Sequence, residues 1–107
     1  MIDNVKIAKA MSDPIRYKIL QKLAKYQASD LPMVNRDPKG GICNCEFMEE
    51  FGLIQSRVSY HMKELTEAGL VLEEPRGKWR YYFLNSETLR EYMEQLRQDF
   101  VLEGRSF

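Results

Sequence analysis

Two cysteines, Cys43 and Cys45, stand one residue apart in the stretch GGICNCEFMEEFG, and they are the two cysteines of the chain. Thiolates prefer soft metals and metalloids over hard ions such as magnesium and calcium. A tetrahedral zinc site takes four ligands, which this pair does not supply alone. In a reducing compartment we expect the pair to serve as ligands or as a redox sensor rather than as a structural disulfide.

The spacing also limits how the two thiols can act together. On a regular α-helix, side chains at positions i and i+2 point roughly 200° apart and cannot grip one atom. Chelation by Cys43 and Cys45 therefore requires that the first turn of the predicted helix is unformed or unwinds. Gly40 and Gly41 stand directly before the pair and make the chain flexible there. We expect a ligand to compete with the geometry of this helix start.

The composition is that of an ordinary globular domain. The chain has 107 residues, 44% of them hydrophobic and 30% charged, which fits one domain over residues 1–107. Lys plus Arg total 16 and Asp plus Glu total 16, so the net charge is zero. The N-terminus lacks a signal-peptide pattern, and no apolar run reaches the ~20 residues of a membrane span. We therefore expect a cytoplasmic protein with no membrane partner.

Apolar periodicity and turn residues predict a mainly α fold with one β-hairpin. Ser12 or Asp13 is expected to cap the second helix. The predicted helices cover residues 2–11, 12–26, 43–52, 55–69 and 86–100, the strands cover 70–74 and 79–84, and a long loop covers 27–42.

Two close helices followed by a hairpin form a winged helix-turn-helix. The helix-turn-helix covers residues 43–68 and the wing covers 70–84. Basic and polar side chains fall on the second helix of the pair and on the wing, the elements that contact base edges and phosphates in such folds. The predicted DNA contacts are Gln55, Ser56, Arg57, Ser59, Tyr60, His61 and Lys63 on the helix, and Arg76, Lys78 and Arg80 on the wing.

The sequence leaves the role of His61 open, because its side chain could pack on the helix surface instead of contacting a phosphate. Along the second strand of the wing, side chains alternate between two faces. One set is Trp79, Tyr81 and Phe83, and the other is Arg80 and Tyr82.

The last helix carries an apolar stripe that could be ordinary core or a dimer interface. Its place after the wing favours an interface, which helix 2–11 would join. The fold class predicted is thus a homodimeric winged helix-turn-helix with dimerisation helices at 2–11 and 86–100. The predicted interface residues are Val5, Ala8, Leu89, Tyr92, Met93, Leu96 and Phe100.

Three segments of the chain carry a pattern that spans roughly residues 8–85. They are AMSDPIRYKIL, LIQSRVSYHMKELTEAGLV and GKWRYYFLN. In order and register they resemble the ArsR/SmtB family of metal-responsive repressors. The resemblance implies a homodimer built on the first and last helices, which binds a pseudo-palindromic operator in double-stranded DNA. It also implies release of that operator when a metal or metalloid binds.

The segment GICNCEF resembles the ELCVCDL-like box of the arsenic- and lead-sensing members. The match places Cys43 and Cys45 on the two thiols of that box. One arsenite-sensing version has a further cysteine where this chain has Met48. Another subgroup binds zinc through histidine on the last helix, and residues 86–100 contain no histidine.

This resemblance and the thiol chemistry together predict trivalent arsenic as the inducer, with no constitutive cofactor. Arsenite has three exchangeable positions, of which Cys43 and Cys45 could fill two. Water, a small thiol or another side chain would take the third. A monomethylated trivalent arsenic has two open positions and matches the pair without help. Another thiophilic metal ion is the alternative inducer.

Other functions also stay open from the sequence. A disulfide between residues two apart is strained, so redox regulation would use a mixed or intermolecular disulfide. Both cysteines could instead be small buried hydrophobic residues without an effector. A thiol enzyme has little support, because the chain has no C-x-x-C and no phosphate-cradling loop. A winged helix that binds only protein is a further alternative.

Overall fold

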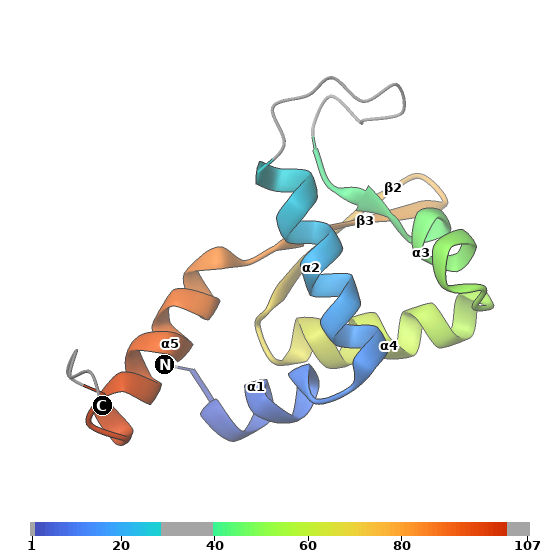
Figure 1. Cartoon of the computed structure of the whole chain (residues 1–107). Helices are drawn as coiled ribbons and strands as arrows, with labels where there is room; N and C mark the ends of the chain where they lie inside the picture. Colours follow the sequence, from blue (N-terminus) through green and yellow to red (C-terminus); the bar gives the residue numbers. More distant parts are fainter. Residues whose placement is uncertain (1, 29–39, 103–107) are drawn as a thin grey trace.

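The computed structural model describes residues 2–28 and 40–102, which contain five α-helices and three short β-strands. Most of the loop predicted at 27–42, residues 29–39, lies outside the described residues. Figure 1 shows the arrangement of the elements, which is the predicted winged helix-turn-helix. The elements are α1 (Asn4–Met11), α2 (Pro14–Ala28), β1 (Ile42–Cys43), α3 (Asn44–Phe51), α4 (Gln55–Glu67), β2 (Val71–Arg76), β3 (Trp79–Leu84) and α5 (Ser86–Asp99).

Aspartate side chains fix where the first two helices begin. Asp3 caps α1 by accepting a hydrogen bond from the Lys6 backbone N–H at 3.1 Å. Asp13 Oδ1 accepts hydrogen bonds from the N–H groups of Ile15 and Arg16 at 2.8 and 3.1 Å. Each bond satisfies a donor that the first turn of a helix leaves unpaired. Of the two caps predicted for the second helix, Asp13 is thus the one that is used.

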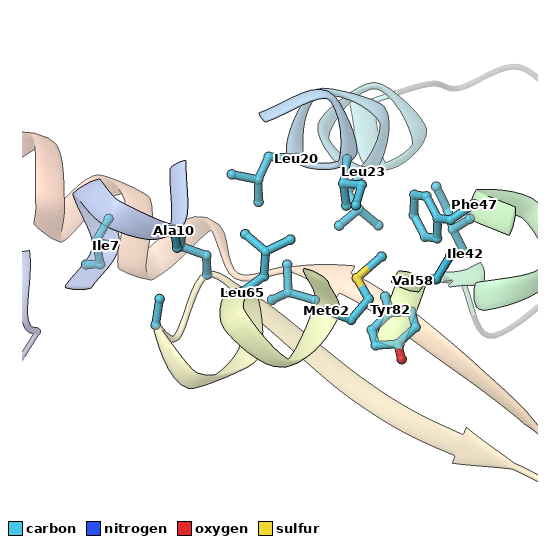
Figure 2. Close-up of a cluster of buried hydrophobic side chains, with 14 residues drawn as sticks. Ile7, Ala10, Leu20, Leu23, Ile42, Phe47, Val58, Met62, Leu65 and Tyr82 are labelled. Carbon is cyan, nitrogen blue, oxygen red and sulfur yellow. The ribbon is translucent and has the colours of Figure 1, made fainter. Parts of the chain in front are cut away.

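The hydrophobic core lies between α2, α4 and the sheet, with α1 and α3 closing its two ends (Figure 2). Burying one aliphatic side chain of this kind stabilises a fold by roughly 1.5–3 kcal/mol. The spacing of the apolar residues along each helix therefore fixes how that helix is rotated about its axis. The buried side chains labelled in Figure 2 are Ile7, Ala10, Leu20, Leu23, Ile42, Phe47, Val58, Met62, Leu65 and Tyr82.

β3 is the central strand of an antiparallel sheet, with β1 on one side and β2 on the other. The register pairs Cys43 of β1 with Tyr81 of β3, and Glu73 of β2 with Tyr82 of β3. The sequence predicts two strands and misses β1, because two residues are too few to show the alternation of a strand. This short strand ties the chain before α3 directly to the wing.

The side chains of β3 alternate as predicted, and Tyr82 faces the core. Tyr82 is 1% exposed, whereas Trp79 on the other set is 40% exposed. The Tyr82 hydroxyl donates a hydrogen bond to Glu73 Oε1 at 3.1 Å. Burial raises the pKa of Tyr82, and the Glu73 carboxylate raises it further, so the hydroxyl keeps its proton and remains a donor.

α5 leaves the end of β3 and extends away from the sheet, with α1 alongside it (Figure 1). Asn4 Nδ2 of α1 donates a hydrogen bond to Asp99 Oδ2 of α5 at 3.3 Å. Thr88 is the one residue of α5 that is buried. Within residues 2–28 and 40–102, no helix has the length and apolar character that crossing a membrane requires.

Gly41→Ala is predicted to destabilise the protein more than Gly77→Ala. Both glycines have positive φ, +87° and +62°, a region that costs other residues about 1–2 kcal/mol. A Cβ at Gly41 would also lie 2.7 Å from Phe83 Cζ, whereas a Cβ at Gly77 would meet nothing within 4 Å. Urea unfolding should show an extra loss of about 1–3 kcal/mol for Gly41→Ala. Equal losses in the two variants would contradict the packing of Gly41 on Phe83.

Candidate thiol site and DNA-binding surface

A left-handed glycine joins the two helices of the helix-turn-helix pair. Gly52 follows α3 with φ +63°, and its backbone N–H donates a hydrogen bond to the Met48 carbonyl. The Leu53 N–H donates to the same carbonyl at 3.1 Å. Glycine adopts this backbone conformation without the steric cost of a Cβ. The chain therefore turns sharply, and α4 begins at Gln55.

α4 divides into a buried side and an exposed side. Val58, Met62 and Leu65 are each at most 1% exposed and pack into the core. Six of the predicted DNA-contacting side chains are exposed, and they supply donors for base edges and phosphates. They are Gln55, Ser56, Arg57, Ser59, Tyr60 and Lys63.

His61 does not belong to that exposed surface. It is 2% exposed, and its Nδ1 lies 3.2 Å from the guanidinium of Arg16. A guanidinium only donates hydrogen bonds, so Nδ1 accepts and the ring proton is on Nε2. Arg16 Nε also donates to the Ala10 carbonyl at 2.7 Å. The predicted DNA contact by His61 is therefore wrong, because its ring ties α4 to the corner between α1 and α2.

Charged neighbours of His61 come from α2, from α4 and from Asp13 just before α2. Burial lowers the pKa of His61; the Asp13 carboxylate opposes this shift, the Arg16 and Arg57 guanidiniums add to it, and the Glu64 carboxylate opposes it. Burial raises the pKa of Asp13, but backbone hydrogen bonds to its carboxylate, together with nearby charges, leave that pKa lowered. Protonation of His61 Nδ1 would place two donors face to face, so the neutral ring fits this site.

Two of the predicted wing contacts remain on the outside of the wing. Lys78 is exposed, and its Nζ lies 5.4 Å from the ring centroid of Trp79. Arg80 forms an ion pair with Glu73, with Nη1 2.9 Å from Oε2, and its side chain is still 55% exposed. Both cations are thus accessible to a phosphate.

Arg76 is directed away from the wing surface. Its side chain is 16% exposed, and its Nη2 donates to Glu74 Oε2 at 2.6 Å and to the Gly40 carbonyl at 3.3 Å. The guanidinium carbon lies 4.3 Å from the ring centroid of Tyr81. A DNA contact by Arg76 would require its guanidinium to leave these partners, and it stays a prediction. These contacts use the guanidinium to hold the chain before β1 against the wing.

Cys43 and Cys45 meet at the junction of β1 and α3. Cys43 is the last residue of β1 and the N-cap of α3, with extended backbone at φ −66° and ψ 144°. Its Sγ accepts a hydrogen bond from the Cys45 N–H at 3.2 Å, and the two Cα atoms are 5.2 Å apart. Because Cys43 stands outside the helix, the two sulphurs converge while α3 keeps its first turn. The helix predicted from residue 43 is thus unformed at Cys43 and begins at Asn44, so no turn of α3 has to unwind for the sulphurs to meet.

The structure joins these two sulphurs in a disulfide. The sequence predicts ligands or a redox sensor, and for redox regulation it favours a mixed or intermolecular disulfide. The pairing of Cys43 with Cys45 corrects that choice of redox partner. The physical reason is the extended backbone of Cys43, which carries its side chain over the first turn of α3 toward Cys45. Cys43 is 7% exposed and Cys45 is partly exposed, so Cys45 is the more accessible sulphur.

Neighbouring side chains of α3 have other partners. Met48, at the place of the third cysteine in one arsenite-sensing pattern, packs against the hydrophobic core. Glu46 and Glu50 face Lys22 of α2, with oxygen–nitrogen distances of 3.8 and 3.1 Å. Across the described residues, no three His, Cys, Asp or Glu side chains gather as a metal site. From these residues the site thus offers two sulphur ligands.

The predicted dimer-interface residues lie on α1, on α5 and at its C-cap Phe100, and several are large exposed apolar side chains. Val5, Met93 and Phe100 are 72%, 64% and 68% exposed. Exposed apolar side chains mark an interaction face where they form a contiguous patch. The other predicted members are Ala8, which is exposed, and Leu89, Tyr92 and Leu96, which are partly buried.

Comparison with known proteins identifies the family of this chain. Residues 39–72, which include α3 and α4, match the family described as "Bacterial regulatory protein, arsR family". An arsenical resistance operon repressor of Bacillus subtilis (strain 168) is 32% identical over 87 residues, which cover 81% of this chain and 70% of that protein. The chain belongs to the ArsR family. This ArsR family member is a DNA-binding transcriptional regulator, and the family is not enzymatic.

Further relatives agree with this assignment. An arsenical resistance operon repressor of Staphylococcus xylosus is 34% identical over 89 residues, 83% of this chain and 71% of that protein. A crystal structure of an ArsR family transcriptional regulator has a TM-score of 0.70 at 19% identity and covers 96% of this chain and 100% of that one. A homodimeric winged helix-turn-helix domain from Mycobacterium bovis has a TM-score of 0.61 at 21% identity, covering 96% and 84%. These structures confirm the predicted fold.

Sequence reasoning missed two residues that complete the sites. Arg16 holds His61 across 45 positions of sequence, and no local pattern indicates that bond. Asn44 is 3% exposed between the two thiols. The sequence shows a polar residue inside the C-x-C stretch. It does not show that the Arg80 N–H on the wing is the partner of that residue.

His61→Asn is predicted to reduce the acid sensitivity of folding, because Asn Oδ1 can accept where Nδ1 does. The folded pKa of His61 lies below its unfolded value of about 6.5, so the unfolded state binds more protons as pH falls and stability is lost. Urea unfolding at about pH 7.5 and about pH 5.5 should show a smaller loss in His61→Asn than in the wild type. An equal loss of unfolding free energy in both proteins would show that carboxylates, and not His61, set the pH dependence of stability.

Proposed function

We propose that this protein is a homodimeric repressor that leaves its DNA operator when trivalent arsenic binds Cys43 and Cys45. The observation that carries the proposal is the convergence of the two sulphurs at the start of α3, the first helix of the helix-turn-helix pair. The relatives in Bacillus subtilis and Staphylococcus xylosus, both named as arsenical resistance operon repressors, support the choice of effector. A group bound at this junction would touch both α3 and the strand that pairs with the wing.

In the reduced protein, Cys43 and Cys45 would each form one sulphur–arsenic bond. With arsenite, two arsenic–oxygen bonds break, and the two hydroxyl groups leave with the two thiol protons as water. The third hydroxyl stays on arsenic or is exchanged for a small thiol. With a monomethylated trivalent arsenic, the same exchange fills both open positions. Two soft sulphur ligands therefore fit either form, and the methylated form needs no further ligand.

The exposed side of α4 would enter the major groove of the operator. Arg57 and Gln55 are suited to base edges, and Lys63 is suited to a phosphate. Lys78 and Arg80 on the wing would contact phosphates beside the groove. Because the net charge of the chain is zero, DNA affinity would depend on these local cations rather than on a long-range positive field.

A second copy of the chain would pack against α1 and α5. The exposed apolar side chains of Val5, Met93 and Phe100 support this face, and so does the homodimeric state of the related Mycobacterium bovis domain. A two-fold dimer presents two α4 helices to half-sites about 34 Å apart, roughly one turn of DNA. The operator would therefore be pseudo-palindromic.

Release of DNA by oxidation is a second candidate, because the structure joins the two sulphurs in a disulfide. With hydrogen peroxide, the two thiols would give up two electrons and two protons, and the peroxide would become two waters. Matched doses of hydrogen peroxide and arsenite, each added to the reduced protein on DNA, separate the two candidates.

Arsenite and monomethylated trivalent arsenic are predicted to release the reduced wild-type protein from DNA upstream of its own reading frame. Cys43→Ser and Cys45→Ser should stay bound, because each lacks one sulphur. Serine at position 43 also keeps an N-cap acceptor, so α3 should stay folded. Fluorescence anisotropy of labelled DNA measures release, with zinc and cadmium as comparison ions. DNA binding that no arsenical disturbs would overturn the choice of effector.

Lys63→Ala is predicted to weaken binding to all DNA sequences and to reduce the slope of log affinity against log salt by about one. Arg57→Ala should cost about 1–3 kcal/mol at the operator and relax its sequence preference. Lys25→Ala, an exposed cation on α2, is the matched control and should leave both quantities unchanged. An unchanged salt slope in Lys63→Ala would contradict the placement of α4 on DNA.

A further inference from the structure

Asn44 lies between the two cysteines and is the first residue of α3. It is 3% exposed, although it is polar. Its Oδ1 accepts a hydrogen bond from the Arg80 backbone N–H at 3.2 Å and lies 3.5 Å from Cys43 Sγ. One side-chain oxygen therefore contacts both the thiol pair and the wing.

The bond from Arg80 continues the pairing of β1 with β3. β1 ends with Cys43 paired to Tyr81, and the next pair in this register would be Asn44 with Arg80. At that point the backbone leaves the sheet and α3 begins. Asn44 Oδ1 takes the position of a backbone acceptor, so the side chain adds one more hydrogen bond between the two elements.

We propose that Asn44 is a positioning residue that transmits the state of the thiol pair to the wing and so sets how strongly a bound effector lowers DNA affinity. The inference rests on the proposed function, since it concerns regulation through the same two sulphurs. The box that this chain resembles has valine between its cysteines, so the amide is a departure that the pattern does not explain.

Asn44 Oδ1 contacts both Cys43 and the Arg80 backbone N–H, and this shared acceptor links the thiol pair to the wing. In the reduced protein the Cys43 thiol can donate to Asn44 Oδ1, which also accepts from the Arg80 N–H. In the disulfide the sulphur has no proton to donate either, and the Arg80 bond to Asn44 is kept. What arsenic adds is a bulky substituent on Cys43 Sγ, which lies 3.5 Å from the Asn44 Oδ1. If the amide turns, the partly buried Arg80 N–H loses its acceptor, which is unfavourable. The wing shifts with the amide, and the cations at Lys78 and Arg80 move relative to DNA.

Four substitutions separate this link from general effects on folding. Asn44→Val and Asn44→Ser remove the contact, because valine has no acceptor and the serine side chain is too short to reach the Arg80 N–H. Asn44→Asp keeps an acceptor at the same place and is the conservative variant. Asn85→Ser makes the same chemical change at a helix N-cap whose side chain forms no capping bond.

The experiment measures DNA affinity by anisotropy with and without arsenite, beside a count of free thiols to show that the sulphurs are occupied. The wild type should show an affinity ratio in the range of about 5- to 150-fold. Asn44→Val and Asn44→Ser should bind arsenite, with the ratio reduced by about fivefold or more. Asn44→Asp and Asn85→Ser should keep the wild-type ratio. A wild-type ratio in both Asn44→Val and Asn44→Ser would overturn the proposal.

A second readout needs no DNA and no particular natural effector. Trp79 is the one tryptophan of the chain and stands beside Arg80 on the wing, so its fluorescence reports wing position. Phenylarsine oxide, which bridges two thiols with loss of one water, should change the Trp79 emission of the wild type but not of Asn44→Ser. No change in the wild type, or an equal change in both proteins, would reject the link. Failure of both arsenite and monomethylated trivalent arsenic to release wild-type protein from DNA, with this fluorescence difference intact, would instead reject only the proposed effector.

Discussion

The position of β3 between β1 and β2 is the constraint on which the rest of the structure depends. Because β3 pairs on both sides, the wing cannot move independently of the segment that carries Cys43. The same strand buries Tyr82 against the core formed by α2 and α4. A two-residue strand, which buries little surface of its own, thus connects the thiol site, the wing and the core.

α4 has a buried apolar side and an exposed side that carries its cations. Its inner side packs Val58, Met62 and Leu65, and it places His61 against Arg16 of α2. Cations on the outer side stay in water, where they cost nothing to expose. Overall neutrality of the chain is therefore compatible with DNA binding, because the local distribution of exposed cations matters more than the net charge.

Helices and the hairpin could be predicted because their signals are local. Caps such as Asp13 and apolar repeats such as Val58, Met62 and Leu65 lie within one or two turns of sequence. The roles of His61 and Arg76 could not be predicted in this way, because their partners, Arg16 and the Gly40 carbonyl, are distant in sequence. The spacing of Cys43 and Cys45 identifies the thiol pair. It does not predict how the two side chains converge, because that depends on the extended backbone of β1, which gives no sequence signal.

Cys43 serves as a helix cap as well as a thiol, and this double role limits which residues could replace it. Sulphur is a weaker hydrogen-bond acceptor than the oxygen of serine or aspartate, which are the preferred caps of helices. The start of α3 is therefore held less firmly than it could be. Serine at this position would favour a more stable helix and, on the proposed function, a protein that arsenic does not release from DNA. On the proposed function, thermal stability and response to arsenic would therefore place opposite demands on this one position.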